Sequence, residues 1–207
     1  WNTSTLTLNK TLTGHNKYID SLTDLKNGYF ASGSADSTIK IWESSTGTLT
    51  RTLTGHTDLV PTLAVLQNGD LASGSRDKTI KIWNPLTGTL KITMTATSSV
   101  FSLAVLQNGD LASGLYKEIA IWDSSNGNMK IKMTGHSDYI IVLAVLPNGY
   151  LASGSMDEIK IWDTITSSLK ETISANNGFI ESLVLLPNGD LASGSVDNTI
   201  KIWKLNF

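Results

Sequence analysis

The sequence has no cysteine, and charged residues make up only 16% of its 207 positions. Without cysteine the chain cannot form a disulfide framework, a thiolate zinc site, an iron–sulfur cluster or a cysteine nucleophile. Sixteen Lys and Arg face 18 Asp and Glu, which gives a net charge of −2. No excess of positive charge is therefore available to bind a nucleic-acid backbone, and we expect no nucleic-acid partner.

Long hydrophobic runs are also missing. No apolar stretch approaches the roughly 18 residues of a membrane span, and no basic stretch followed by an apolar one predicts a signal peptide. We therefore expect no membrane partner. The absence of thiols fits either redox state, and we expect the cytoplasm as the location, with the nucleus as the alternative. The first residue is Trp1 and not methionine, so we expect the natural protein to be longer.

What the sequence does contain is a repeat. Its six tryptophans are spaced by 41, 41, 39, 40 and 41 residues, and between them an Asn-Gly pair recurs five times, each followed closely by Leu-Ala-Ser-Gly or Phe-Ala-Ser-Gly. A period of about 40 residues is the size of one blade of a β-propeller. The tryptophans lie at positions 1, 42, 83, 122, 162 and 203, and the Asn-Gly pairs begin at 27, 68, 108, 148 and 188.

Two units are shorter than the others. Unit three has lost two residues and unit four has lost one. Since a one-residue slip inside a strand would move every side chain to the other face, we expect these deletions to lie in turns. The shortened stretches are 94–103 and 106–122 in unit three and 146–162 in unit four.

Within each unit the local signals predict strands. The segments 62–66, 71–73 and 79–83 are short, mostly apolar and bounded by turn-forming residues. Asn-Gly between two such runs predicts a type I′ hairpin, which needs positive φ at both central residues. Two further turns and the connection through Gly-His give four strands per unit.

Several residues of the repeat resemble the WD-repeat β-propeller family. They are the pairs Gly14-His15, Gly55-His56 and Gly135-His136, the turn aspartates 36, 77, 157 and 197, and the pairs Trp122-Asp123 and Trp162-Asp163, in the family's order. The resemblance implies an all-β fold, a propeller of five four-stranded antiparallel blades that forms a single domain over residues 1–207. Units three and five depart from the pattern, because Ala96-Thr97 and Ala175-Asn176 replace Gly-His.

The family also implies what the repeated polar residues do. A histidine, a strand serine, a turn aspartate and the tryptophan indole can form one buried chain of hydrogen bonds. The serine is Ser32, Ser73 or Ser153, or else Ser34, Ser75 or Ser155 on the same face of the strand. The residues expected in this structural network are His15, Asp36, Trp42, His56, Asp77, Trp83, His136, Asp157, Trp162, Asp197 and Trp203.

Serine, histidine and aspartate also form acyl-transfer triads, and histidine with aspartate can hold a metal. An active site is needed once, however, and this set recurs from unit to unit. We therefore interpret the histidines as structural and expect no catalytic residues, no cofactor and no bound metal.

The positions that differ between units predict where a partner binds. In the family, the two residues that flank a β-branched position after Gly-His, and the residue before the turn aspartate, line the top rim of the channel. Aromatic residues, Met and Arg are enriched in interface cores. The expected partner-binding residues are Tyr18, Asp20, Leu59, Pro61, Arg76, Phe101, Tyr139, Ile141, Met156, Phe179 and Glu181.

The leading hypothesis is a non-catalytic scaffold that binds a protein or peptide on this top face. One alternative is a propeller-type hydrolase or lyase that uses channel residues, and another is a purely architectural segment of a larger multidomain protein. We also expect the first strand, about residues 5–13, to complete the last blade with residues 179–206, and we favour a closed ring over an open arc. Otherwise each end would expose an apolar blade face.

Overall fold

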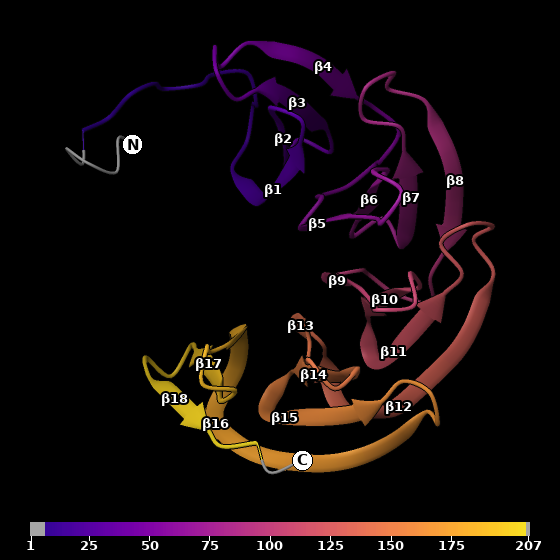
Figure 1. Cartoon of the computed structure of the whole chain (residues 1–207), viewed down its shortest axis with the longest axis vertical. Coiled ribbons are helices and arrows are strands. Elements are labelled where there is room, and N and C mark those ends of the chain that lie inside the picture. The colour runs from indigo at the N-terminus through magenta and orange to yellow at the C-terminus, as the bar shows by residue number, and fades with distance from the viewer. Residues whose placement is uncertain (1–6, 206–207) are drawn as a thin grey trace.

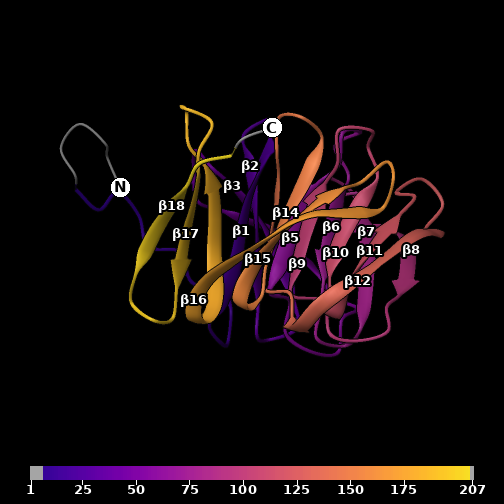
Figure 2. The ribbon, with the colours of Figure 1, turned by 90° about the horizontal axis from the view of Figure 1, so that it is seen from below.

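The computed structural model describes residues 7–205, apart from the side chain of Asn176. Its 18 strands pair only with antiparallel neighbours and form a curved row of five blades (Figure 1). Seen from the side, the blades stand next to one another and their strands run across the thickness of the row (Figure 2). The all-β propeller prediction is confirmed. Within the described residues no helix is long and apolar enough to cross a membrane.

The first three blades each contain four strands, and their innermost strands are β1, β5 and β9. Blade 1 consists of β1 (Ile19–Lys26), β2 (Tyr29–Ser34), β3 (Ile39–Glu43) and β4 (Leu49–Leu53). Blade 2 consists of β5 (Thr62–Val65), β6 (Leu71–Gly74), β7 (Thr79–Trp83) and β8 (Leu90–Thr95). Blade 3 consists of β9 (Ser102–Val105), β10 (Leu111–Gly114), β11 (Tyr116–Trp122) and β12 (Met129–Tyr139).

The last two blades share one long strand. Blade 4 contains β13 (Val142–Val145), β14 (Tyr150–Gly154), β15 (Met156–Asp163) and the first part of β16 (Ser168–Leu185). The second part of β16 is the innermost strand of blade 5, which continues with β17 (Leu191–Ser195) and β18 (Ile200–Trp203). Blade 5 therefore has three strands among the described residues, where the repeat predicts four.

The hydrophobic core lies between the blades. Four clusters fill the four interfaces, and each joins the third strand of one blade to the first two strands and the tryptophan of the next. Between blades 2 and 3, for example, Ile80 and Ile82 lie in the same buried cluster as Leu103 and Trp122. The tryptophans of blades 2 to 5 thus belong to the contact with the preceding blade.

A side chain of one blade also fits closely against a glycine of the blade before it. A Cβ atom at Gly114 would lie 2.7 Å from the carbonyl oxygen of Ile140 and 3.0 Å from its Cγ2, so only glycine leaves room for this approach. The backbone N–H of Ile140 donates to the carbonyl of Leu115 at 3.0 Å. The pairs Val60 with Gly33, Val100 with Gly74 and Ile180 with Gly154 repeat the contact.

The two ends of the row lack this contact. Ile19, which is equivalent to Ile140, is 51% exposed, whereas its four counterparts are 0% exposed. In blade 5, Ile200 and Ile202 are 80% and 63% exposed, although the corresponding isoleucines of the other blades are buried. Figure 1 shows the row as an open arc with β1 at one end and β18 at the other. The structure thus does not show the closure that we favoured.

The expected first strand is described from residue 7. Lys10 Nζ donates to the carbonyl of Ser45 at 2.7 Å, and Leu12 lies so close to Gly47 that a Cβ there would be 2.5 Å from its Cδ2. In the same way, the outer strand of blade 1 lies against Gly88 of blade 2, through Leu53. Residues 7–13 thus lie outside blade 1, and β18 has β17 as its ladder partner. Residues 5, 6 and 206 are outside the described part.

The hairpin prediction holds for unit one only. There Asn27 and Gly28 both have positive φ, 54° and 83°, and they connect the paired residues Lys26 and Tyr29. In the other four units the glycine alone has positive φ. In blade 2 the N–H of Gly69 donates to the carbonyl of Leu66, so a wider turn ends in the left-handed glycine. The prediction of type I′ turns there was wrong.

Candidate functional site

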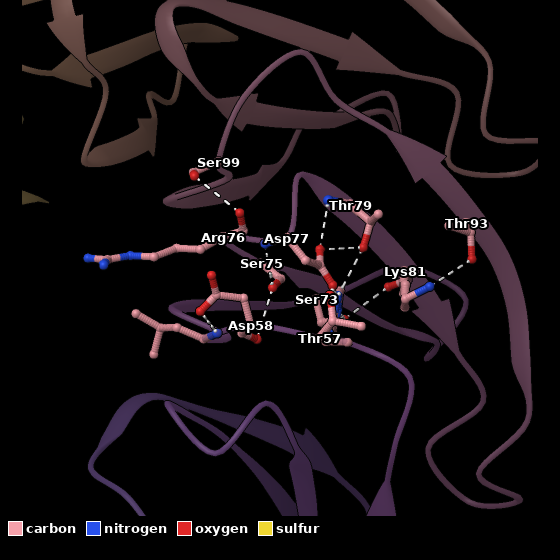
Figure 3. Close-up of polar contacts among 12 residues, drawn as sticks. Thr57, Asp58, Ser73, Ser75, Arg76, Asp77, Thr79, Lys81, Thr93 and Ser99 are labelled. Carbon is pink, nitrogen blue, oxygen red and sulfur yellow. Dashed lines mark hydrogen bonds and ion pairs between the residues drawn. The ribbon is translucent and has the colours of Figure 1, made fainter.

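Three blades contain a buried chain of hydrogen bonds. In blade 2, His56 Nδ1 lies 2.8 Å from Asp77 Oδ2, and its Nε2 lies 2.8 Å from Ser73 Oγ. Trp83 Nε1 donates to the same Ser73 oxygen at 2.9 Å. Figure 3 shows part of this arrangement, with Asp77 directed toward Thr79. Blade 1 repeats the chain through His15, Ser32, Asp36 and Trp42.

The protonation states follow from the partners. An ionised Asp77 only accepts, so Nδ1 of His56 carries the hydrogen and Nε2 accepts from Ser73. Burial lowers the pKa of His56, although Asp77 opposes this. Burial acts to raise the pKa of Asp77, but hydrogen bonds from Thr79, the backbone of Thr57 and His56 lower it to about 2. Both directions favour a neutral histidine beside an ionised aspartate.

The structure also distinguishes the two candidate serines. Ser32, Ser73 and Ser153 accept from the tryptophan and lie beside the histidine. The second serine of each strand donates instead to a backbone carbonyl of the loop that precedes the innermost strand. These bonds are Ser34 to Tyr18, Ser75 to Asp58 and Ser155 to Tyr139.

Blade 4 requires a correction, because the carboxylate beside His136 belongs to Glu158 and not to Asp157. Glu158 Oε1 lies 2.8 Å from His136 Nδ1, and Oε2 lies 2.9 Å from Lys160 Nζ. Asp157, at the start of β15, has a φ of 63° and accepts from the N–H of Gly178. The deletion shortens the turn before β15 and moves the aspartate outward, and the longer glutamate side chain reaches the ring. Burial lowers the pKa of His136 to about 4.

Blades 3 and 5, which have no histidine, keep the bond between tryptophan and serine. Trp122 Nε1 donates to Ser113 Oγ, and Trp203 Nε1 donates to Ser193 Oγ, both at 2.9 Å. Asp197 of blade 5 still accepts from a loop N–H, that of Asn177, at 3.3 Å. The tryptophan–serine bond is therefore common to all five blades, and the histidine is an addition in three.

This geometry does not favour catalysis. Ser73, which would be the nucleophile of a triad with His56 and Asp77, is 0% exposed and accepts from an indole N–H. A substrate carbonyl cannot reach it without opening the blade. Among the described residues, no group of three or more His, Asp or Glu side chains is placed to hold a metal ion. The network is suited to holding each blade rigid.

The rim above the network is different in character. We call Phe101, Tyr139 and Tyr116 the aromatic ridge. Phe101 precedes β9, Tyr139 ends β12 and Tyr116 begins β11. The rings of Phe101 and Tyr139 meet edge to face with centroids 5.0 Å apart, and those of Tyr139 and Tyr116 are 4.8 Å apart. Tyr116 is 44% exposed, and the other two rings are half-buried.

The deletions in units three and four create this ridge. In blade 2 the third strand starts at Thr79, after a complete turn. In blades 3 and 4 the shortened turn lets the third strand begin earlier, at Tyr116 and at Met156. These extensions pair with the following strand, Tyr116 with Tyr139 of β12 and Met156 with Phe179 of β16. A turn deletion has thus become a strand pairing at the rim.

Two cations lie at the ends of the ridge. The guanidinium of Arg76 lies 5.2 Å from the ring centroid of Phe101, and Lys117 Nζ lies 4.9 Å from that of Tyr116. Figure 3 shows Arg76 directed away from the network while its neighbour Asp77 belongs to it. Asp20 of blade 1 is also near Arg76: burial raises the pKa of Asp20 and the guanidinium acts against this.

The other predicted rim residues fall into three groups. Leu59 is only 5% exposed, so its place in a binding surface was wrong: the side chain is part of the core. Tyr18 is 64% exposed, but it belongs to blade 1, apart from the ridge. Asp20, Met156 and Glu181 are exposed, and Pro61, Ile141 and Phe179 are half-buried.

Tyr116 and Lys117 were not predicted from the sequence. Tyr116 occupies the same position of its unit as Arg76 and Met156, which were. The rim position of each unit was located from the turn aspartate that follows it. Unit three has no such aspartate, and Tyr116 was therefore missed.

Comparison with known proteins gives a consistent picture. The model of the WD domain, G-beta repeat, matches residues 6–43, 47–84 and 167–204, more than half of the chain. Among solved structures, the crystal structure of the WD40 β-propeller domain of Doa1 is similar, with a TM-score of 0.85 and 30% identity. The match covers 95% of this chain and 67% of that one. No curated protein shows a significant match.

Proposed function

Because the chain belongs to the WD40-repeat family, we propose that it is a non-catalytic scaffold that binds a protein or peptide segment on the aromatic ridge. WD40 propellers generally act as protein-interaction scaffolds and are typically not enzymes. The observation that supports the site is the row of contacting rings Phe101, Tyr139 and Tyr116 at the rim.

The location of the ridge in the sequence adds to this. The family model leaves residues 85–166 unmatched, and all three ridge residues fall in that stretch. The repeat is therefore least regular where the rim is most aromatic. Its scaffold is intact there, since Trp122 and Trp162 are buried as in the other units. Loss of repeat regularity without loss of packing is what a specialised surface on a common scaffold requires.

The exposure of the ridge also favours binding over packing. Tyr116 is 44% exposed, so a large part of its side chain contributes nothing to the core. Tyrosine and phenylalanine offer large contact areas at low entropic cost, and they are enriched at interface centres. A partner that covers them would bury apolar surface that is now in water.

Affinity capture with the tagged chain tests the proposal. We expect replacement of the ridge residues Tyr116 and Tyr139 by alanine to abolish capture of partner proteins while the melting temperature stays nearly unchanged. Ile165→Ala is the control, because Ile165 is 90% exposed in a turn at the opposite end of the strands. Capture that survives the double replacement, or that is lost equally in Ile165→Ala, would argue against the ridge as the site.

A further inference from the structure

The two cations at the ends of the ridge suggest the chemistry of its partner. We propose that the ridge binds an extended segment with an aromatic or large apolar side chain near its centre and with carboxylates that reach Arg76 and Lys117. This inference rests on the proposed function, since it names the partner of the same surface.

The orientation of the charged groups supports an acidic partner. On the loop side of blades 2 and 3, three carboxylates accept hydrogen bonds from other groups of the chain. Asp77 belongs to the histidine network, and Asp58 accepts from the N–H of Leu59. Glu118 accepts from Thr97 and pairs with Lys132 at 2.8 Å.

Arg76 and Lys117, in contrast, lie beside the aromatic ridge. Both are exposed, and each lies over an aromatic ring. Cation–π contacts leave the N–H groups of a cation free to donate, and a guanidinium can hold a carboxylate through two parallel bonds. The cations are therefore held in place by the rings and still able to bind an anion. Asp20 of blade 1 lies close enough to Arg76 for the guanidinium to lower the pKa of its carboxyl, against the effect of burial.

Between the cations, the ridge favours an apolar side chain. The rings of Phe101 and Tyr139 are inclined at 70°, and those of Tyr139 and Tyr116 at 52°. Rings arranged in this way present both edges and faces, and an incoming aromatic side chain can meet them in the edge-to-face geometry that such pairs prefer.

The length of the site follows from the contacts. Arg76, the three rings and Lys117 are joined by four steps, each close to 5 Å. The cations are therefore at most about 20 Å apart, which an extended segment of about six residues spans at roughly 3.3 Å per residue. The partner element is a short linear segment.

Cations beside aromatic rings also occur in single-strand nucleic-acid sites. The rest of this rim argues against that reading. Asp138 of β12, Asp157 of β15 and Glu181 of β16 continue it through blades 4 and 5, and the whole chain has a net charge of −2. A phosphate backbone longer than the ridge would meet these carboxylates.

Selection of displayed random hexapeptides on the full chain tests the inference. We expect enrichment of peptides with Phe, Tyr, Trp, Leu or Met flanked by Asp or Glu. The double variant R76Q/K117Q should weaken binding of a selected acidic peptide on the order of tenfold, with a smaller salt dependence. Lys17→Gln is the control, because it removes one exposed positive charge from the same side of blade 1 and should leave binding unchanged.

Other outcomes separate this inference from the proposed function. If the selected peptides are neutral or basic but lose binding in Tyr139→Ala, the ridge is a binding site and the acidic preference is overturned. If no selected peptide depends on Phe101 or Tyr139, both proposals fail. Binding of a fluorescent oligothymidylate that is lost in R76Q/K117Q would overturn the peptide assignment in favour of nucleic acid.

Discussion

Replacing Ile140 and Ile19 by alanine, one at a time, compares the same position of the repeat in two environments. Ile140 is 0% exposed and lies against Gly114 of the preceding blade, whereas Ile19 is 51% exposed at the open end of the arc. Ile→Ala removes three carbons, and at about 0.8 kcal/mol each the transfer cost for Ile140 is roughly 2.4 kcal/mol. The cavity that remains raises the expected loss of unfolding free energy to about 3–4 kcal/mol.

For Ile19 the expected loss is about 1 kcal/mol or less, because half of the side chain is already in water and no closed cavity forms. Urea unfolding followed by tryptophan fluorescence measures both values, provided that the slope with denaturant is unchanged. Equal losses for the two variants would refute the reasoning. They would mean that the face of blade 1 is covered in solution, as it would be in a closed ring.

The glycine side of the contact provides an independent check. A Cβ at Gly114 would meet the backbone oxygen of Ile140 at 2.7 Å, and backbone cannot move aside cheaply. At Gly194 of blade 5, the corresponding Cβ would meet only the Oγ of Ser182, which can rotate. We expect Gly114→Ala to be strongly destabilising and Gly194→Ala to cost much less, by the same unfolding measurement. A large loss for Gly194→Ala would again indicate a covered end.

Three further predictions concern the network. His56→Ala should lower the free energy of unfolding by about 1–3 kcal/mol because it leaves buried partners unpaired; unchanged melting would contradict the network. Glu158→Gln should destabilise blade 4 more than Asp157→Asn, and the reverse order in thermal unfolding would restore the aspartate as the partner of His136. Stability should fall as the pH drops from about 6.5 to about 4, because the folded state holds the pKa of His136 near 4 and the unfolded chain takes up a proton first. A flat profile of unfolding free energy over that range would show that this histidine is not held neutral.

The scaffold could be predicted from the sequence because it is local and repeated. Trp83 is buried and bonded to Ser73 in the way that Trp42 is to Ser32, so one correct assignment extends to every unit. The identity of the bonded serine could not be predicted, since Ser73 and Ser75 lie on the same face of the strand. Only the position of the loop before β5 determines that Ser73 lies beside His56 while Ser75 donates to the carbonyl of Asp58.

The sequence does not show how a deletion rearranges the residues around it. Counting residues located the deletion in unit four, but the count does not say whether Asp157 or Glu158 then faces His136. Closure, which the structure does not show, is also out of reach of the sequence, because it depends on the small rotation between successive blades. That rotation is set by contacts such as Ile140 on Gly114, which leave Ile19 and Gly194 at the two ends of an arc.

The deletions in the turns before β11 and β15 also explain how a regular scaffold acquires an irregular surface. A residue lost inside a strand would have exchanged the core and solvent faces, and Ile119 and Ile159 would no longer be buried. Because the residue is lost from the turn, both isoleucines stay at 0% exposure, and only the rim of the blade changes. At the rim, the third strand gains Tyr116 in one blade and Met156 in the next, each paired with a residue of the following strand. The core therefore tolerates the loss of a turn residue, and the same loss creates a new contact surface at the rim. A search for function in such repeats should begin at the units whose turns have lost residues.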